Sequence, residues 1–346
     1  MRVTSIAIAI AIIAGSMAGA ASVLFKTTAQ LGATAGPVPG VEITRIPLGN
    51  VGTDLQFGEG AVWLMAHDTV YRVDAVTNRL TRVHIDGEAK WMAVGEGGVW
   101  VSVCTSLPDT GRCPGSVIRI DPQSLRVVAT IHLPDSVEEP FSMATGLGGV
   151  WILADAPHQL FEIDPNTNSI HTALPAPPQT LLLGASLGSV WLGMGEGKGI
   201  LRVDPGSGRI HTIVGTSPVA IAITPNAVFG SDPISLVSGT LKKIDPHTNR
   251  VVATLDVANR YWVAAGEHGV WLAGAVPQGT EMLRVDPLTM RPVGSRIVIP
   301  VNRSSQGFGY VGPGLPIPWV VTGAGSVWVF RFADGEIDRV TPPGGA

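Results

Sequence analysis

The sequence predicts an all-β fold: a single seven-bladed β-propeller with four-stranded blades, closed by its N-terminal strand. Two repeated signals and one unpaired strand predict it. The first signal is a Gly-x-Val-aromatic motif, seen most clearly at Gly97-Gly98-Val99-Trp100. Its aromatic residue recurs at spacings of 37, 51, 40, 38, 42 and 57 residues, at Trp63, Trp100, Trp151, Trp191, Phe229, Trp271 and Trp328. A period of about forty residues built from strand-like segments indicates radial repetition of a small sheet.

The second signal is a short β-branched run that ends in Asp-Pro or a close relative, about twenty residues after each aromatic residue. Its copies end at Asp74, Pro122, Pro165, Pro205, Pro246, Pro287 and Pro342. An Asp at the first position of a turn can accept backbone N–H bonds, and Pro fixes φ for the next residue. Asn or Gly in the fifth place, as at Asn168, Gly208 and Asn249, favours a left-handed residue that closes a hairpin. We therefore interpret these Asp residues as structural rather than as a carboxylate array.

One blade must be completed from the other end of the chain. In a complete repeat we expect four strands, labelled a to d, at residues 92–94, 99–101, 117–120 and 127–131. The last repeat ends after residues 337–340 without a strand d, while residues 41–48 alternate apolar and polar side chains with no repeat before them. The N-terminal strand should therefore complete the seventh blade and remove exposed sheet edges.

The composition fits this fold and excludes one class of partner. Only 14% of the 346 residues are charged, while Gly (43) and Pro (27) are abundant, as short buried strands joined by tight turns require. The net charge is −4 and the chain has no basic run, so we expect no nucleic-acid partner.

The N-terminus should deliver the propeller outside the cytoplasm. Residues 1–25 have a positive start, an apolar centre and small residues before Ala21, as in a cleaved signal peptide. The same stretch is long and apolar enough to serve as an uncleaved membrane anchor, and both interpretations stay open. Residues 26–40 are predicted to be a linker and residues 41–346 the propeller. We expect a secreted or extracytoplasmic monomer that contacts a membrane only through an uncleaved N-terminal segment.

The repeat units, such as "GGVWV … VIRIDPQSLRVVATI", resemble the extracytoplasmic seven-bladed propellers of the YVTN / virginiamycin B lyase-like superfamily. The resemblance covers residues 41–346. It implies the fold and an extracytoplasmic location, but it does not imply one activity, because the superfamily includes lyases, lactonases and members without an assigned activity. A propeller is a scaffold, and its function depends on its site.

The resemblance does not extend to the catalytic residues of the lyases. Streptogramin lyases of that family carry Trp-Phe-Thr-Glu at strand b, whereas no Glu occurs three residues after the aromatic residue here. Those positions hold Ala66, Val103, Ala154, Met194, Asp232, Gly274 and Arg331. The His residues are spread over outer strands and separate turns, so no converging metal-ligand set is predicted. Four Asp residues could conceivably converge: Asp54, Asp68, Asp232 and Asp334.

Three insertions interrupt the repeat in one sector of the ring. The first holds the only two Cys residues, Cys104 and Cys113, for which an exported chain predicts a disulfide bond. The others are the b–c loop at residues 274–281 and the d–a loop at residues 299–318. Loops of these two kinds share one face of a propeller.

A ligand site is predicted beside these insertions, at the residue nine positions before each strand-b aromatic residue. Across the seven blades this position holds Asp54, Trp91, Ser142, Leu182, Ala220, Trp262 and Trp319. The three Trp residues should offer stacking surfaces at the channel mouth, with Asp54 as a polar anchor and Arg260 and Tyr261 beside them. The alternative is that these Trp side chains only plug the channel mouth.

The sequence thus favours a non-catalytic binding module without a cofactor, whose ligand is a glycan, an envelope polymer or a peptide. The alternative is a lyase or lactonase-like hydrolase that acts on a small cyclic substrate with a divalent cation in the channel mouth.

Overall fold

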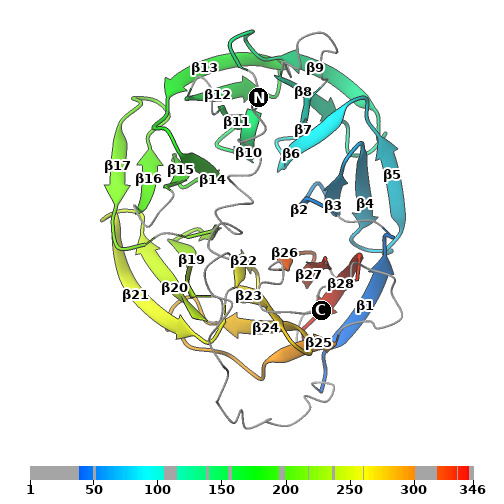
Figure 1. Ribbon diagram of the computed structural model, residues 1–346, viewed down its shortest axis with the longest axis vertical. Coiled ribbons are helices and arrows are strands. Elements are labelled where there is room, and N and C mark those ends of the chain that lie inside the picture. The colour runs from blue at the N-terminus through cyan, green and yellow to red at the C-terminus, as the bar shows by residue number, and fades with distance from the viewer. Residues whose placement is uncertain are drawn as a thin grey trace, which may run out of the picture. The chain divides into compact units, whose positions relative to one another are not determined.

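A computed structural model describes residues 39–49, 52–104, 115–137, 140–154, 158–194, 199–216, 218–235, 238–259, 261–300, 318–332 and 334–342. These residues belong to one compact unit, Pro37–Ala346, and form 28 β-strands and no helix. The strands make seven four-stranded antiparallel sheets arranged as the blades of a propeller (Figure 1). The predicted fold class is confirmed.

Each blade runs from an inner strand a to an outer strand d, and we number the blades from β2. Blade 1 is β2 (Asp54–Gly58), β3 (Ala61–Ala66), β4 (Thr69–Asp74) and β5 (Leu80–His84). Blade 2 is β6 (Glu88–Gly95), β7 (Gly98–Cys104), β8 (Gly115–Ile120) and β9 (Val127–His132). Blade 3 is β10 (Pro140–Gly146), β11 (Gly149–Ala154), β12 (Gln159–Asp164) and β13 (Ser169–Pro175). Blade 4 is β14 (Thr180–Ser186), β15 (Ser189–Met194), β16 (Gly199–Val203) and β17 (Ile210–Ile213).

The remaining blades follow the same plan until the last strand. Blade 5 is β18 (Ala220–Thr224), β19 (Ala227–Ser235), β20 (Ser238–Asp245) and β21 (Arg250–Val257). Blade 6 is β22 (Trp262–Gly266), β23 (Gly269–Val276), β24 (Gly279–Val285) and β25 (Ile297–Pro300). Blade 7 is β26 (Trp319–Gly323), β27 (Ser326–Arg331), β28 (Glu336–Thr341) and β1 (Glu42–Pro47).

The N-terminal strand closes the ring as predicted. β1 pairs antiparallel with β28, from Glu42 opposite Thr341 to Pro47 opposite Glu336. In Figure 1 the blue first strand lies beside the red last strand. The inner strand β2 contacts both β6 and β26, so the circle of inner strands is continuous across this seam.

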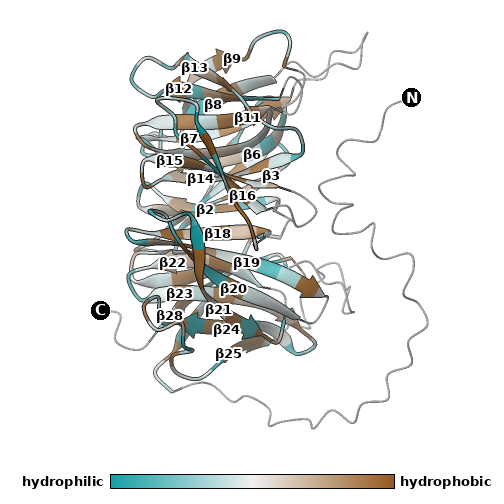
Figure 2. Cartoon of the chain, turned by 90° about the vertical axis from the view of Figure 1, so that its left-hand side faces the viewer, coloured by the Kyte–Doolittle hydropathy of each residue, from teal (hydrophilic) through white to brown (hydrophobic). Residues whose placement is uncertain are grey.

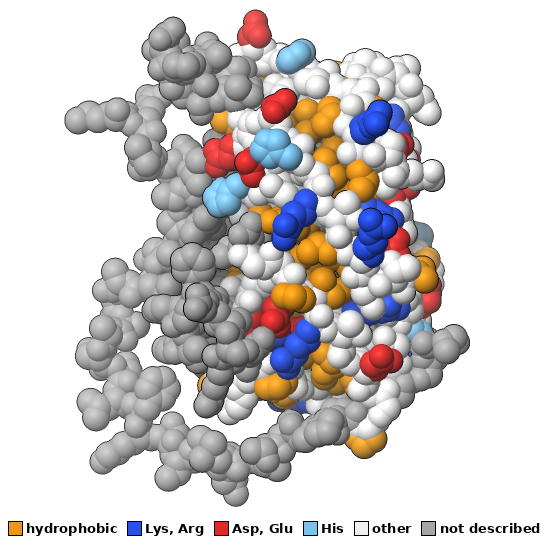
Figure 3. Space-filling model, turned by 90° about the vertical axis from the view of Figure 1, so that its right-hand side faces the viewer, with side chains coloured by type: hydrophobic (Ala, Val, Ile, Leu, Met, Phe, Trp, Pro, Cys, Tyr) orange, Lys and Arg blue, Asp and Glu red, His pale blue; other side chains and the backbone are white. Residues whose placement is uncertain are grey.

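The hydrophobic core lies between neighbouring blades rather than in one central mass. Trp100 of blade 2, for example, belongs to the same buried cluster as Met143 and Ile152 of blade 3. Figure 2 shows hydrophobic stretches along the strands and hydrophilic colours in many of the turns at the rim. The outer wall on the right of Figure 1 mixes hydrophobic side chains with Lys and Arg (Figure 3), which protects outer strands from edge-to-edge pairing.

The c–d turns confirm the predicted turn chemistry. The fifth residue is left-handed at Asn168 (φ 54°), Gly208 (φ 68°) and Asn249 (φ 56°). Asp74 Oδ1 accepts the backbone N–H of Thr77 at 2.9 Å, and this bond is the largest of those that lower the pKa of Asp74 to about 2. The carboxylates at these turns therefore hold hairpins in shape.

The strand-b aromatic residues are buried and form a repeated contact. Five Trp side chains donate their indole N–H to the carbonyl five residues earlier, at the end of strand a, over 3.0–3.2 Å. These donors are Trp63, Trp100, Trp151, Trp191 and Trp328. Each is at most 1% exposed, so these side chains pack the blades and are not available to a ligand.

A basic residue on strand c links each of four blades to the next. Arg119 of blade 2 stacks over Trp100 and donates from Nη1 to the carbonyl of Pro165 (2.6 Å) and to Asn168 Oδ1 (3.0 Å) of blade 3. Equivalent bonds start at Arg202, Lys243 and Arg339 and end at Pro246, Pro287 and Asn78, respectively. The c–d turns therefore also accept hydrogen bonds from the neighbouring blade.

Replacing Arg119 with methionine should lower the free energy of unfolding by about 2 kcal/mol, because hydrogen bonds from a charged donor contribute about 1.5–3 kcal/mol. The carbonyl of Pro165 would lose its charged donor at a partly buried interface. Urea unfolding followed by circular dichroism measures this loss. The exposed Arg126→Met serves as the control, and equal stability of the two variants would contradict an inter-blade role for Arg119.

One predicted loop is wrong. Residues 274–281 were expected to form an inserted b–c loop, but β23 and β24 run on through Val276 and from Gly279, which leaves a two-residue turn. Backbone pairing of Gly274 with Glu281 and of Ala275 with Thr280 extends the hairpin, in which Thr280 and Glu281 are buried. The other two insertions, at residues 105–114 and 301–317, lie outside the described residues. Across the part of the chain that the structure covers, no helix has the length and apolar character needed to cross a membrane.

Candidate functional site

The structure brings two of the three predicted Trp residues together. Trp262 begins β22 and Trp319 begins β26, so they occupy the same end of the inner strands of blades 6 and 7. Their ring centroids are 6.0 Å apart and the planes are tilted by 30°. Phe332 stands edge-on to Trp319, with centroids 5.5 Å apart and planes at 90°. All three are half-buried, and we call them the aromatic cluster.

The third residue, Trp91, lies elsewhere. Its side chain packs against the hydrophobic core between blades 2 and 3, and its backbone N–H donates to Ser102 Oγ at 3.0 Å. A register shift between Ala89 and Trp91 interrupts the pairing of β6 with β7 at Lys90. A bulge of this kind re-aims neighbouring side chains, so the same repeat position does not give Trp91 the same surroundings as Trp262.

Asp54 is a buried link between two inner strands. It is 8% exposed and accepts hydrogen bonds from Gln56 Nε2 (3.0 Å) and from the backbone N–H of Met92 (3.1 Å) in blade 2. Burial raises the pKa of Asp54 to about 7, against the effect of these hydrogen bonds. A carboxyl group in this position holds blades 1 and 2 together, and a ligand could reach it only by displacing part of this contact.

Tyr261 is also buried, and it joins blades 5 and 6. Its hydroxyl donates to Glu281 Oε1, and Glu281 in turn pairs with Arg296 at 3.1 Å. Ser231 Oγ of blade 5 donates to the carbonyl of Tyr261 at 2.6 Å. Burial is the main reason that the pKa of Tyr261 lies above its ordinary value, and the Glu281 carboxylate adds to it.

Two predicted residues lie outside the described part of the chain. Arg260 is one of them, so its position next to Tyr261 stays a sequence prediction. Cys113 is the other, and the disulfide bond with Cys104 therefore also stays a prediction. Cys104 itself ends β7 and is 5% exposed.

A buried ionic group that sequence reasoning missed occupies the b–c end of blade 7. Arg331 is 3% exposed and pairs with Asp334, Glu336 (2.8 Å) and Asp338, while its Nη1 donates to the carbonyl of Pro300 at 3.2 Å. Burial raises the pKa of Asp338, and Arg331 opposes that rise. The signal was present in the sequence, because Arg331 is the only basic residue three positions after a repeat aromatic residue.

The four Asp residues considered for a metal site occupy separate surroundings. Asp232 of blade 5 accepts a hydrogen bond from Thr216 Oγ1 (2.9 Å) and forms an ion pair with Lys242 Nζ (2.7 Å). Asp68 is exposed on blade 1 at 3.5 Å from His84 Nδ1. Within the described ranges, no three His, Cys, Asp or Glu side chains lie close enough together to hold a metal ion.

Comparisons with known proteins identify the architecture. No protein-family model and no curated protein matches the sequence. Solved structures do match. The Cps50 (Swd1) β-propeller domain of Myceliophteria thermophila has a TM-score of 0.61 and 12% identity, over 86% of this chain and 99% of that one. A chain in the mitotic checkpoint complex has a TM-score of 0.62 and 12% identity, over 93% and 99%.

A third similar structure is the extracellular domain of BT4673 from B. thetaiotaomicron, with a TM-score of 0.55 and 11% identity. The match covers 87% of this chain and 43% of that one. At such identities the likeness shows the fold alone and does not identify a superfamily. Together with the seven four-stranded sheets, it establishes that the chain is a seven-bladed β-propeller.

Proposed function

We propose that this protein is an exported, non-catalytic binding module of the YVTN / virginiamycin B lyase-like type, whose ligand stacks on Trp262 and Trp319. The observation that carries the proposal is the pair itself: two half-buried indoles from adjacent inner strands, 6.0 Å apart. Aromatic faces held in this way by a rigid scaffold suit flat, weakly polar ligand surfaces.

The inner strands favour a neutral ligand. Apart from Lys90, their half-buried positions hold uncharged side chains, such as Gln56, Leu181, Ile221, Ile223 and Val321. Among the described residues of these strands, only Asp54, Glu88 and Lys90 carry ionisable groups. Asp54 is buried, and Lys90 pairs with Glu88 at 2.8 Å. A wall of this kind gives little attraction to a charged ligand. A neutral sugar ring, presented by a glycan or an envelope polymer, fits it best, and an apolar peptide side chain is the next candidate.

The similar structures support a binding role in a general way. One of them is part of the mitotic checkpoint complex, which is an assembly of several chains, and another is an extracellular domain. Both facts belong to those proteins. They are consistent with an interaction role for this propeller, because a propeller is a scaffold that can carry a binding site.

The test is a calorimetric titration of the full chain with neutral oligosaccharides, charged oligosaccharides and short apolar peptides. The double variant Trp262→Ala/Trp319→Ala should weaken binding of the neutral ligand at least about fivefold, because it removes two stacking contacts of about 0.5–1.5 kcal/mol each. Trp91→Ala is the matched control, since it removes a half-buried indole from the same repeat position in blade 2, outside the aromatic cluster.

Two results would contradict the proposal. Unchanged affinity in the double variant would exclude the aromatic cluster as the site. Loss of stability in that variant, with no binding of any ligand by the native protein, would mean that the two indoles only fill the channel mouth. Circular dichroism of each variant separates a lost site from a lost fold.

A further inference from the structure

The a–b hairpin of blade 6 departs from the repeat. In five other blades the two central residues of this turn both have positive φ, as at Glu96 (51°) and Gly97 (70°) in blade 2. Such turns are of the type I′ kind that suits hairpins. Blade 6 has Glu267 and His268 at these places, and neither has positive φ; Gly269 adopts φ 116° instead. The a–b turn of blade 6 therefore does not adopt the type I′ conformation of those five blades.

This change leaves two polar groups without protein partners. The indole N–H of Trp271 makes no hydrogen bond in the described structure, although five equivalent Trp residues donate to the carbonyl at the end of strand a. The Nε2 atom of His268 is buried and also has no partner. Buried polar groups are normally satisfied, so the buried Nε2 atom of His268 calls for an explanation.

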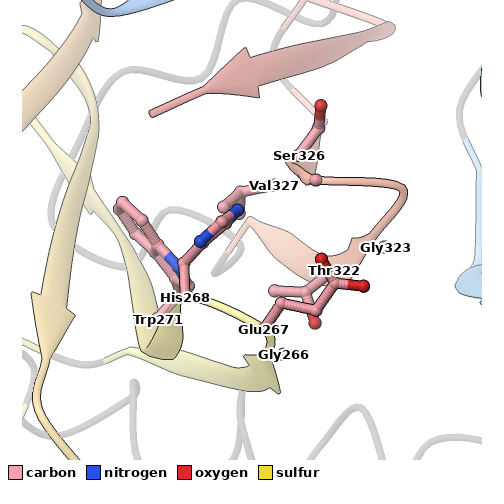
Figure 4. Close-up of a pocket in the computed structure, with 9 residues that line it drawn as sticks. Gly266, Glu267, His268, Trp271, Thr322, Gly323, Ser326 and Val327 are labelled. Atoms are coloured by element: carbon pink, nitrogen blue, oxygen red, sulfur yellow. The ribbon is translucent and has the colours of Figure 1, made fainter. Parts of the chain in front are cut away.

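Both residues line one small hollow between the a–b hairpins of blades 6 and 7. His268 and Trp271 form one side, and Thr322, Gly323 and Ser326 form the other (Figure 4). The hollow has a volume of about 20 Å³, which is room for roughly one oxygen-sized group. It opens at the end of β22 and β26 opposite to Trp262 and Trp319, so it is separate from the aromatic cluster.

The chemistry of the lining selects the kind of ligand. An indole N–H can only donate, so the bound group must accept a hydrogen bond. Two guanidinium groups flank the hollow, because Arg284 Nε donates to the carbonyl of His268 and Arg339 Nε donates to Ser326 Oγ at 2.9 Å. One acidic residue, Glu267, is among the lining residues, and it is exposed to solvent. The balance of charge favours an anionic acceptor.

We propose that this hollow binds the carboxylate of a peptide or small organic acid, with one oxygen accepting hydrogen bonds from Trp271 Nε1 and His268 Nε2. Neutral imidazole carries its proton on either nitrogen, and the carboxylate selects the form protonated at Nε2. The second oxygen remains at the solvent-facing rim. The site does not depend on the function proposed for the aromatic cluster.

The experiment follows the indole N–H resonances of the full chain by ¹H–¹⁵N NMR during titration with sodium acetate at constant ionic strength. Trp271→Phe identifies the Trp271 signal. We expect that signal alone to shift saturably, in the millimolar range. Gly-Gly-Gly, its C-terminal amide, and an amidated and acetylated Gly-Asp-Gly then distinguish a peptide terminus from a side-chain carboxylate.

Two variants make the test specific. His268→Gly gives blade 6 the turn sequence of blade 2, Gly-Glu-Gly-Gly, so the Trp271 N–H should bond to the carbonyl of Gly266 and the acetate response should disappear. His268→Gln keeps a side-chain N–H donor and should retain weakened binding. A shift that stays linear with acetate, or that persists unchanged in His268→Gly, would overturn the proposal and leave the hollow as a water site.

Discussion

Replacing Arg331 with methionine should lower the free energy of unfolding by about 3–5 kcal/mol at neutral pH, because removal of one partner leaves buried charges uncompensated. Arg331 pairs with Asp334, Glu336 and Asp338, all of them buried, and Arg45 lies 3.9 Å from Asp338. The loss should be visible as a lower urea midpoint.

The pH dependence of this loss is its diagnostic feature. Arg331 lowers the pKa of the buried Asp338, so without Arg331 that pKa should rise further above its unfolded value. Stability from such groups is fully present below the unfolded pKa, near 4, and is lost as pH rises through the folded pKa. The difference in the free energy of unfolding between the variant and the native protein should therefore shrink toward pH 4.

Arg250→Met, at an exposed position, is the control and should change the free energy of unfolding by less than about 0.5 kcal/mol at either pH. A loss that does not vary with pH would mean that Arg331 acts through packing alone.

The fold could be predicted from the sequence because the motifs of one blade are repeated seven times. Each copy of the Trp and Asp-Pro signals sets the register of one blade, and errors in one copy are corrected by the others. The seam was predictable for the same reason, since residues 41–48 match only the strand missing after residue 340. Even the inter-blade bonds have a signal in the sequence, because three of the four basic residues stand two places before the turn Asp, as Arg119 stands before Asp121, and Arg339 stands two places before Thr341.

The site could be predicted only in part, because it depends on how single blades depart from the repeat. The position nine residues before the strand-b aromatic residue correctly groups Trp262 with Trp319, which lie in the neighbouring blades 6 and 7. It fails to add Trp91, since an irregularity at Lys90 changes the pairing in blade 2. Burial is likewise invisible in the sequence: Asp54 was expected to face a ligand and instead accepts the N–H of Met92.

The buried Asp54 should make the protein more stable in mild acid than at alkaline pH. Its pKa in the folded protein is about 7, whereas its ordinary pKa is 3.8. The native state therefore holds this proton between those values while the unfolded chain releases it, so the free energy of unfolding falls as pH rises. Each pKa unit corresponds to 1.36 kcal/mol, which gives a contribution of about 4 kcal/mol, fully present below pH 4 and lost as pH rises through 7.

Asp54→Asn isolates this contribution from those of the other titrating groups. Asparagine keeps the shape of the side chain and an oxygen for the N–H of Met92, and Gln56 can turn its amide to accept from the new Nδ2. The variant should match the native protein near pH 4 and exceed its stability by about 3–4 kcal/mol at pH 8, because it avoids a buried unpaired charge. Urea midpoints measured from pH 4 to 8 test this, with the exposed Asp256→Asn as the control. Parallel curves for the native protein and Asp54→Asn would show that Asp54 ionises without cost, and that water or a cation reaches it between blades 1 and 2.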